Sequence, residues 1–90
     1  MNSQYEIFVS GRVQGVGFRA AAKKQARWLS LKGWVQNRVD GSVKIVICGD
    51  SGNCTRFINW CREGTPYSWV DKVKINEMKP EDLGPFRVIY

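Results

Sequence analysis

Five stretches of this 90-residue chain have a strand-like pattern, in which hydrophobic and polar positions alternate or, over residues 43–48, nearly every residue is β-branched or apolar. These stretches are rich in β-branched and aromatic residues and so predict β-strands. They are residues 5–10, 32–37, 43–48, 69–78 and 86–90. The alternation of the fourth stretch is disturbed near Lys72, which predicts a β-bulge there. Asp40 and Gly41, between the second and third stretches, predict a hairpin turn.

Two further stretches, residues 16–30 and 54–61, have apolar residues at the spacing of one helix face. The apolar positions are Phe18, Ala22, Ala26 and Leu29 in the first stretch, and Cys54, Phe57, Ile58 and Cys61 in the second. Basic residues lie largely off the first stripe, which predicts a helix with a basic outer face. For the second helix, Asn53 after a polar loop over residues 49–53 is expected to be the N-cap. Gly64 and Pro66 are expected to end it.

The elements follow the order strand, helix, strand, strand, helix, strand, with one more strand at the end. This is the order of the ferredoxin-like split βαβ arrangement. We therefore predict one domain over residues 1–90, an α+β sandwich with two helices on one face of an antiparallel sheet and an extra C-terminal strand. A chain of this length has room for one hydrophobic core and no second domain.

The predicted topology brings two distant segments together. In a ferredoxin-like sheet the first two strands run parallel on either side of the third, so their C-terminal ends lie at one edge, about 10 Å apart. The glycine-rich turn after residues 5–10 and Asn37 at the end of residues 32–37 should therefore be neighbours, although 18 positions separate Arg19 from Asn37.

Charge is distributed unevenly along the chain. The net charge is +6, and residues 7–39 contain seven basic residues and no Asp or Glu. A field of one sign near a site raises the local concentration of ligands of the opposite sign. Nucleic acid, acidic lipid and small phosphorylated compounds are all candidate partners on this evidence.

The cysteines and the chain start exclude several other classes. Cys48, Cys54 and Cys61 form no CxxC motif and the chain has no His, so we expect buried thiols and neither a metal site nor a cofactor. There is no apolar run of about 18 residues for a membrane span. The N-terminus also lacks the basic start and apolar stretch of a signal peptide. A cytoplasmic protein without membrane association is expected.

The stretch SGRVQGVGFR, residues 10–19, places three glycines and two arginines between a strand and a helix. A cation in the first turn of a helix opposes the helix dipole. Arg19 is therefore unfavourable unless an anion lies between it and the free main-chain amides. The alternative is that the glycines only allow a tight turn and that Arg19 is solvated. Residues 15–20 also match GxGxxG/A, but the dinucleotide-binding fold needs a longer parallel sheet.

Three segments closely resemble acylphosphatase. They are GRVQGVGFR, the pattern Ala-x-x-Leu-x-Leu-x-Gly-Trp-Val-x-Asn over residues 26–37, and Asp-Gly-x-Val over residues 40–43. The first two are highly specific because long strings match at matched spacing. The likeness covers almost the whole chain and favours the anion site over the simple turn.

The resemblance implies a role for each matched residue. Main-chain amides of the turn cradle a phosphate, the Arg19 guanidinium binds it, and Asn37 positions the water that attacks phosphorus. The turn consists of Gln14, Gly15, Val16, Gly17, Phe18 and Arg19. No metal and no covalent enzyme intermediate are implied. The implied substrate is a small acyl phosphate, and the products are a carboxylate and inorganic phosphate, which should also inhibit competitively.

The chemistry of these residue types agrees with that assignment. A carboxylate is a good leaving group and needs no general acid, while positioned donors stabilise the charge of a loose phosphoryl-transfer transition state. The planar fork of Arg19 bonds two phosphate oxygens at once. Asn37 offers an acceptor and a donor but takes up no proton, so it orients water without being a base. Arg12 and the Gln14 side chain are expected to support the loop.

Three residues depart from the family pattern, all of them in turns. Ser30 stands where Gly is usual after the first helix, and a left-handed Ser would cost on the order of 1 kcal/mol relative to Gly. Thr65 and Ser68 replace the common Pro and Ala. We expect a small loss of stability and no change in the chemistry.

Two other functions fit parts of the sequence. The RNA-recognition fold shares the element order, but it needs stacking aromatics on its central strands. Residues 43–48 contain none, so no nucleic-acid partner is expected. A non-catalytic copy of the fold, such as a domain split from a larger hydrogenase-maturation protein, would also share the pattern, but here Arg19 and Asn37 are both intact. We expect a monomer, with core or edge packing for Trp28, Trp34, Trp60 and Trp69.

Overall fold

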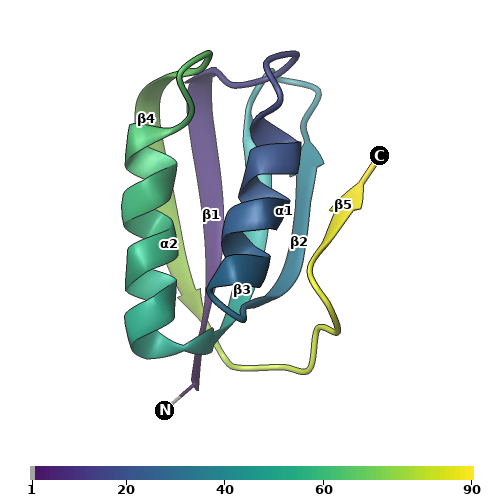
Figure 1. Cartoon of the computed structure of the whole chain (residues 1–90), viewed down its shortest axis with the longest axis vertical. Helices are drawn as coiled ribbons and strands as arrows, with labels where there is room; N and C mark the ends of the chain where they lie inside the picture. The colour runs from purple at the N-terminus through teal and green to yellow at the C-terminus, as the bar shows by residue number, and fades with distance from the viewer. Residues whose placement is uncertain (1) are drawn as a thin grey trace.

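The computed structural model describes residues 2–90 and contains five strands and two helices (Figure 1). In chain order they are β1 (Asn2–Arg12), α1 (Phe18–Trp28), β2 (Lys32–Asn37), β3 (Val43–Asp50), α2 (Ser51–Glu63), β4 (Trp69–Met78) and β5 (Arg87–Ile89). Every strand and helix expected from the sequence is present, with ends shifted by a few residues. The domain predicted for residues 1–90 is described here from residue 2 onward.

The five strands form one sheet in the order β4-β1-β3-β2-β5. β3 lies between β1 and β2 and is antiparallel to both, so β1 and β2 run in the same direction, as predicted. β5 pairs with β2 in parallel, which makes the sheet mixed. Both helices cover the same face of the sheet (Figure 1). The predicted α+β ferredoxin-like fold is confirmed.

The hydrophobic core lies between the helices and the inner face of the sheet. Alternate residues of the central strands point inward, and Ile7, Val35 and Ile45 are fully buried. Two large rings complete the core, Phe57 from α2 and Phe86 from the segment before β5, with ring centroids 6.2 Å apart. Because apolar burial is the main favourable contribution to folding, this layer fixes both helices, and with α1 the turn that precedes it.

The helix starts differ from the prediction for local reasons. α2 begins at Ser51, so the prediction that Asn53 caps it is wrong, and residues 49–53 are not a separate loop. Asp50 is the N-cap, and its Oδ2 accepts a hydrogen bond from the Asn53 main-chain N–H at 3.1 Å. A carboxylate at this position also complements the positive end of the helix dipole.

The turn after α1 bears out the expectation for Ser30. Ser30 has φ 56° and is the one non-glycine residue with positive φ among residues 2–90. In the second departing turn, Ser68 Oγ accepts a hydrogen bond from the Thr65 main-chain N–H at 2.7 Å. The hydroxyl of Ser68 thus helps to close this turn, a hydrogen bond that an Ala at this position could not make.

The bulge predicted near Lys72 is present between β1 and β4. Ser10 pairs with Lys72 but the next residue, Gly11, pairs with Val70, so Asp71 is the extra residue. Gly11 has φ 127°, and a Cβ there would collide with the main-chain oxygen of Trp69. This close approach explains why β1 carries a glycine at position 11.

The tryptophans differ in how far they are buried. Trp60 packs against Phe18 and Phe57, with ring centroids 5.2 and 5.7 Å apart. Trp28 is 82% exposed at the end of α1, so the expectation that it packs in the core or at an edge is wrong. Trp69 is 70% exposed and lies in β4, an edge strand of the sheet. Both occur at the end of an element, and the pattern of apolar positions says little about which side such a residue faces.

The three cysteines are buried free thiols, as expected. Burial raises the pKa of the Cys54 thiol to about 11, and it raises the pKa of Cys61 further. A thiol with a raised pKa carries little thiolate at neutral pH and is a poor nucleophile. The buried cysteines therefore serve as small apolar residues of the core.

Candidate functional site

The turn between β1 and α1 carries unpaired main-chain donors. Gly15 and Gly17 both have positive φ, 73° and 77°, a conformation that L side chains rarely adopt. Ala21 is the first residue of α1 whose amide finds a main-chain acceptor, the carbonyl of Gly17 at 3.1 Å. Among residues 2–90 no acceptor lies in hydrogen-bond range of the amides of residues 15–20. Such a set of free amides at a helix N-terminus is a site for an anion.

A cavity of about 160 Å³ opens at this turn. Its wall comes from the turn, the start of α1, the end of β2 and the C-terminal residues. The lining residues are Val13, Gly15, Gly17, Phe18, Arg19, Ala20, Asn37, Val88 and Tyr90. The expected proximity of Arg19 and Asn37 is therefore confirmed, since both residues line one cavity.

Arg19 enters the cavity from the first turn of α1. Its side chain is half-buried, and its Cζ lies 4.9 Å from the centre of the Tyr90 ring. No carboxylate among the described residues lies within ion-pair distance of Arg19. The guanidinium is held over an aromatic ring, and its hydrogen-bond donors are left for a ligand.

Asn37 is the last residue of β2 and lines the same cavity. Its Oδ1 is buried and has no hydrogen-bond partner among the described residues. A buried acceptor without a partner costs about 1–3 kcal/mol, and such groups are concentrated where a ligand or a water completes the set. The side chain thus fits a role in holding a small polar molecule.

Gln14 and Val16 belong to the turn but do not line the cavity. The side-chain amide of Gln14 donates hydrogen bonds to the main-chain carbonyls of Arg38 at 2.7 Å and Ser42 at 2.8 Å. These bonds tie the turn to the hairpin between β2 and β3, as expected for a supporting side chain. Of Gln14, only the main chain is available to an anion.

The hairpin after Asn37 is closed by its own hydrogen bonds. Asp40 Oδ1 accepts bonds from the hydroxyl and the main-chain N–H of Ser42, at 2.6 and 2.9 Å. These bonds hold the pKa of the Asp40 carboxyl below its usual value of 3.8. With Gln14 bonded to the same hairpin, the position of Asn37 relative to the turn is fixed from both sides.

The sequence did not point to Val88 and Tyr90 as part of the site. Residues 86–90 were expected to form a strand, but nothing in them indicated which strand they would join. Parallel pairing of β5 with β2 aligns Val88 with Val35 and carries the chain toward Asn37. Pairing between strands is decided by tertiary packing, so a pattern within five residues carries no signal for it.

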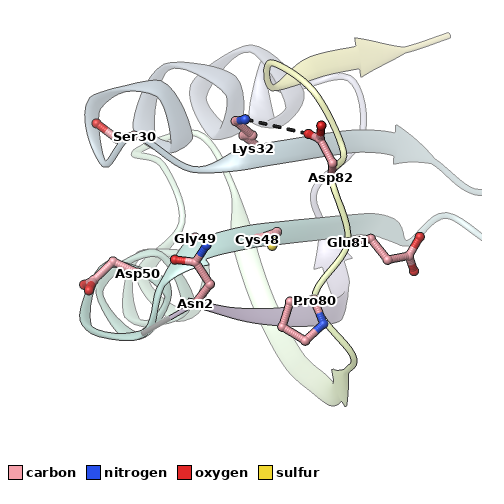
Figure 2. Close-up of a pocket in the computed structure, with 9 residues that line it drawn as sticks. All are labelled: Asn2, Ser30, Lys32, Cys48, Gly49, Asp50, Pro80, Glu81 and Asp82. Carbon is pink, nitrogen blue, oxygen red and sulfur yellow. Dashed lines mark ion pairs between the residues drawn. The ribbon is translucent and has the colours of Figure 1, made fainter.

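A second, larger hollow lies at the other end of the sheet, where the segment between β4 and β5 crosses (Figure 2). It has a volume of about 470 Å³, and its rim carries the carboxylates of Asp50, Glu81 and Asp82. Asp82 forms an exposed ion pair with Lys32 at 3.7 Å. Carboxylates repel a phosphate, so the smaller cavity at the glycine turn is the better candidate for an anion-binding site.

Two kinds of feature are missing from residues 2–90. No three His, Cys, Asp or Glu side chains gather so that they could hold a metal ion. Neither helix combines the length and the apolar composition that a membrane span requires. The metal-free reaction expected from the sequence is tested by the chelation experiment described below.

Known proteins share both this sequence and this architecture. The acylphosphatase family model matches residues 5–88. An acylphosphatase of Azoarcus sp. is 43% identical over 87% of this chain and 80% of its own. The solved structure of an acylphosphatase from Coxiella burnetii is 39% identical, covers 98% of this chain and 93% of its own, and has a TM-score of 0.94.

A longer protein contains a related domain at lower identity. A structure of full-length HypF in the phosphate- and nucleotide-bound form is 26% identical, with a TM-score of 0.87, and covers 100% of this chain but only 12% of its own. The higher identity and the nearly full mutual coverage lie with the acylphosphatases of similar length. On its sequence and its structure, this chain belongs to the acylphosphatase family.

Proposed function

We propose that this chain hydrolyses the carboxyl–phosphate bond of small acyl phosphates by direct attack of water. In this proposal the main-chain amides of residues 14–19 and the Arg19 guanidinium hold the phosphate, and Asn37 holds the attacking water. The activity itself follows from membership of the acylphosphatase family. The roles of the individual residues are our inference from the site.

One observation carries the proposal. Free amides, an unpaired guanidinium and a buried acceptor without a partner all meet at one small cavity. The Asn37 acceptor is unfavourable alone, because a buried polar group loses its hydrogen bond with water and gains none in the protein. A phosphate with an adjacent water would satisfy all three, the donors through its oxygens and the acceptor through the water.

The leaving group determines what the enzyme needs to supply. An acyl phosphate departs as a carboxylate, whose conjugate acid has a pKa near 4, so no proton donor is required at neutral pH. The phosphoryl group passes through a loose transition state with charge on its equatorial oxygens. Donors fixed in advance stabilise that charge without reorganisation. A bidentate Arg19 and the amides of the turn are donors of this kind.

The nucleophile needs position more than activation. Asn37 accepts one hydrogen bond from water and aims its oxygen at phosphorus, and holding a reactant in place supplies several kcal/mol of the barrier. An amide takes up no proton, so in this mechanism the proton of the water passes to a phosphate oxygen of the substrate. The phosphoryl–carboxylate bond breaks as the new P–O bond forms.

Hydrolysis of benzoyl phosphate by the purified protein in excess chelator tests the proposal. We expect full activity with chelator present and little activity on phosphate monoesters, whose alkoxide leaving groups need acid or metal assistance. Activity that disappears in chelator and returns with magnesium or zinc would contradict the mechanism. Efficient monoester hydrolysis would contradict the assigned leaving-group requirement.

The remaining expectations concern the surroundings of the enzyme. Inorganic phosphate should compete with the substrate, because the proposed cradle binds the transferred group and not the acyl half. The cytoplasmic location and the monomeric state stay predictions, the second of which sedimentation measures directly. The acyl half of the natural substrate is left open, since acetyl, carbamoyl and other acyl phosphates share the reacting group.

A further inference from the structure

No helix of residues 2–90 covers the face of the sheet opposite α1 and α2 (Figure 1). The segment between β4 and β5 crosses one end of this face, where the Glu81 main-chain N–H donates a hydrogen bond to Gln4 Oε1 at 2.8 Å. The end near the hairpin between β2 and β3 carries Arg38, Lys72 and Lys74. We propose that this open face binds single-stranded nucleic acid, a function separate from acyl phosphate hydrolysis. The sequence alone led to the expectation of no nucleic-acid partner, because residues 43–48 contain no aromatic residue. The structure removes that objection, since aromatic side chains reach the middle of this face from the strands beside β3.

Strand register shows how the aromatic and basic residues alternate across the open face. Phe8 of β1 lies opposite Lys44 of β3 on one side and Lys74 of β4 on the other. Trp34 of β2 lies on the same face, one row away. Lys44 Nζ lies 5.6 Å from the centre of the Phe8 ring and 5.5 Å from that of Trp34. A lysine thus lies between two half-buried rings on the central strands.

A hollow of about 250 Å³ adjoins Phe8 near the hairpin. Arg38, Lys72 and Lys74 contribute three cations to its wall, and Asp40 contributes one carboxylate. That carboxylate accepts two hydrogen bonds from Ser42, and no carboxylate among residues 2–90 forms an ion pair with the three cations. The hollow therefore keeps a net positive charge that suits a phosphodiester.

Arg38 adds a flat surface to this hollow. Its Cζ lies over the Phe8 ring, 4.9 Å from the ring centre, in a cation–π contact. Proteins bind single strands by stacking bases on aromatic rings and on guanidinium planes while cations track the phosphates. Elsewhere on the face, Lys44 is paired with Glu6 at 3.3 Å, which leaves Lys72 and Lys74 as the main phosphate contacts.

A single strand fits this surface better than a duplex. In a single strand the bases are free to leave their neighbours and lie on Phe8 and Trp34, whereas in a duplex they are stacked on each other. The contacts would be sequence-tolerant because every base has a π-face. Charge would also attract an acidic membrane, and binding to vesicles that contain acidic lipid is measured below as the competing outcome.

Fluorescence anisotropy of a labelled oligouridylate of about 12 nucleotides measures the binding. We expect saturable binding to the whole chain that weakens steeply between about 50 and about 200 mM salt. Lys72→Glu/Lys74→Glu should weaken it by about tenfold or more, because two phosphate contacts become repulsive. The matched control is Lys23→Glu/Lys24→Glu on the outer face of α1, which changes net charge equally. It should weaken binding by less than about threefold.

Further variants test whether oligonucleotide binding depends on the Phe8 ring and whether it depends on the hydrolytic site. Phe8→Leu should weaken binding by about fivefold or more, and Phe8→Tyr should restore it, because base stacking requires the ring and not its volume. Arg19→Gln should leave oligonucleotide binding unchanged, and Lys72→Glu/Lys74→Glu should leave kcat for benzoyl phosphate unchanged. Together these two results would show that hydrolysis and oligonucleotide binding use separate residues.

Four results would overturn the proposal. They are no saturable binding at low salt, equal weakening by the two double charge reversals, loss of binding in Arg19→Gln, and binding to vesicles that contain acidic lipid but not to the oligonucleotide. None of these bears on the proposed hydrolysis, which is measured with benzoyl phosphate in the same preparations.

Discussion

At the scale of single residues, Arg19 and Asn37 should fail in different ways when they are replaced. Arg19→Gln removes a charge-assisted donor pair, so kcat/KM for benzoyl phosphate should fall by about 10²–10³-fold and phosphate binding should weaken strongly. Asn37→Ala removes only the support of the water. Phosphate affinity should then stay within a few-fold of the parent while kcat falls by about 10²-fold or more. Titration with phosphate and single-turnover hydrolysis measure the two quantities separately.

Asn37→Asp is the companion to this comparison. It keeps size and acceptor but places a negative charge beside the bound phosphate, so it should weaken phosphate binding as well as kcat. An Asn37→Ala protein with near-parental kcat, or one that loses phosphate binding as completely as Arg19→Gln does, would contradict the roles assigned here.

Tyr90 is expected to position Arg19. Its ring lies under the guanidinium at 4.9 Å, and a cation–π contact at an exposed site contributes about 0.5–1 kcal/mol. Tyr90→Leu should therefore raise KM for benzoyl phosphate by about 2–5-fold with a smaller change in kcat. Tyr90→Phe keeps the ring and should behave like the parent. Equal effects of Leu and Phe would show that the hydroxyl, not the ring, matters.

At the scale of elements, the end of α1 holds a correctable strain. Ser30 has φ 56°, which costs an L residue about 1–2 kcal/mol. Ser30→Gly should relieve it and raise the free energy of unfolding by about 1 kcal/mol, less than the full strain because glycine also loses more entropy on folding. Ser30→Ala keeps the strain and should not stabilise. Urea denaturation of the parent, Ser30→Gly and Ser30→Ala measures the free energy of unfolding. We expect kcat to be the same in all three proteins.

The hairpin between β2 and β3 should become sensitive to acid through Asp40. Hydrogen bonds from Ser42 lower the pKa of the folded carboxyl below 3.8, so the folded state binds the proton less readily than the unfolded chain. The stabilisation is complete above the unfolded pKa and is lost as pH falls through the folded pKa. Asp40→Asn should therefore differ from the parent in free energy of unfolding at pH 6, and the difference should start to shrink as pH falls below about 4 and disappear only below the folded pKa. A constant difference across that window would show that Asp40 acts without titrating.

The elements show which features a sequence carries and which it does not. The proximity of Arg19 and Asn37 was predictable because it follows from strand order, and strand order follows from alternating patterns. The cap of α2 was missed because Asp50 and Asn53 are both good N-caps, and only the length of β3 decides between them. The position of Tyr90 depends on the pairing of β5 with β2, which is determined by tertiary packing. The aromatic residues of the open face lie on separate strands, so no local sequence motif predicts that they are neighbours.

At the scale of the whole molecule, the basic segment around the glycine turn and the basic hollow on the open face lie near each other at one end of the sheet. Residues 7–39 carry seven basic residues and no acidic ones, and this segment contains the turn, α1 and β2. The hollow on the open face lies beside Asn37, at Arg38. A field of one sign raises the local concentration of an anionic substrate and falls off over the Debye length. The field should therefore contribute to substrate capture and hardly at all to the chemical step.

Because the field acts on substrate capture and not on the chemical step, we can predict how activity depends on salt. Raising ionic strength should increase KM for benzoyl phosphate more than it lowers kcat, because capture is screened and the contacts inside the cavity are not. Lys23→Glu/Lys24→Glu, which weakens the field without touching the cavity lining, should lower kcat/KM at low salt and show a flatter salt dependence. At about 1 M salt, where the Debye length is about 3 Å, the variant and the parent should converge. A gap in kcat/KM that persists at high salt would mean that the lysines act through local contacts with the substrate.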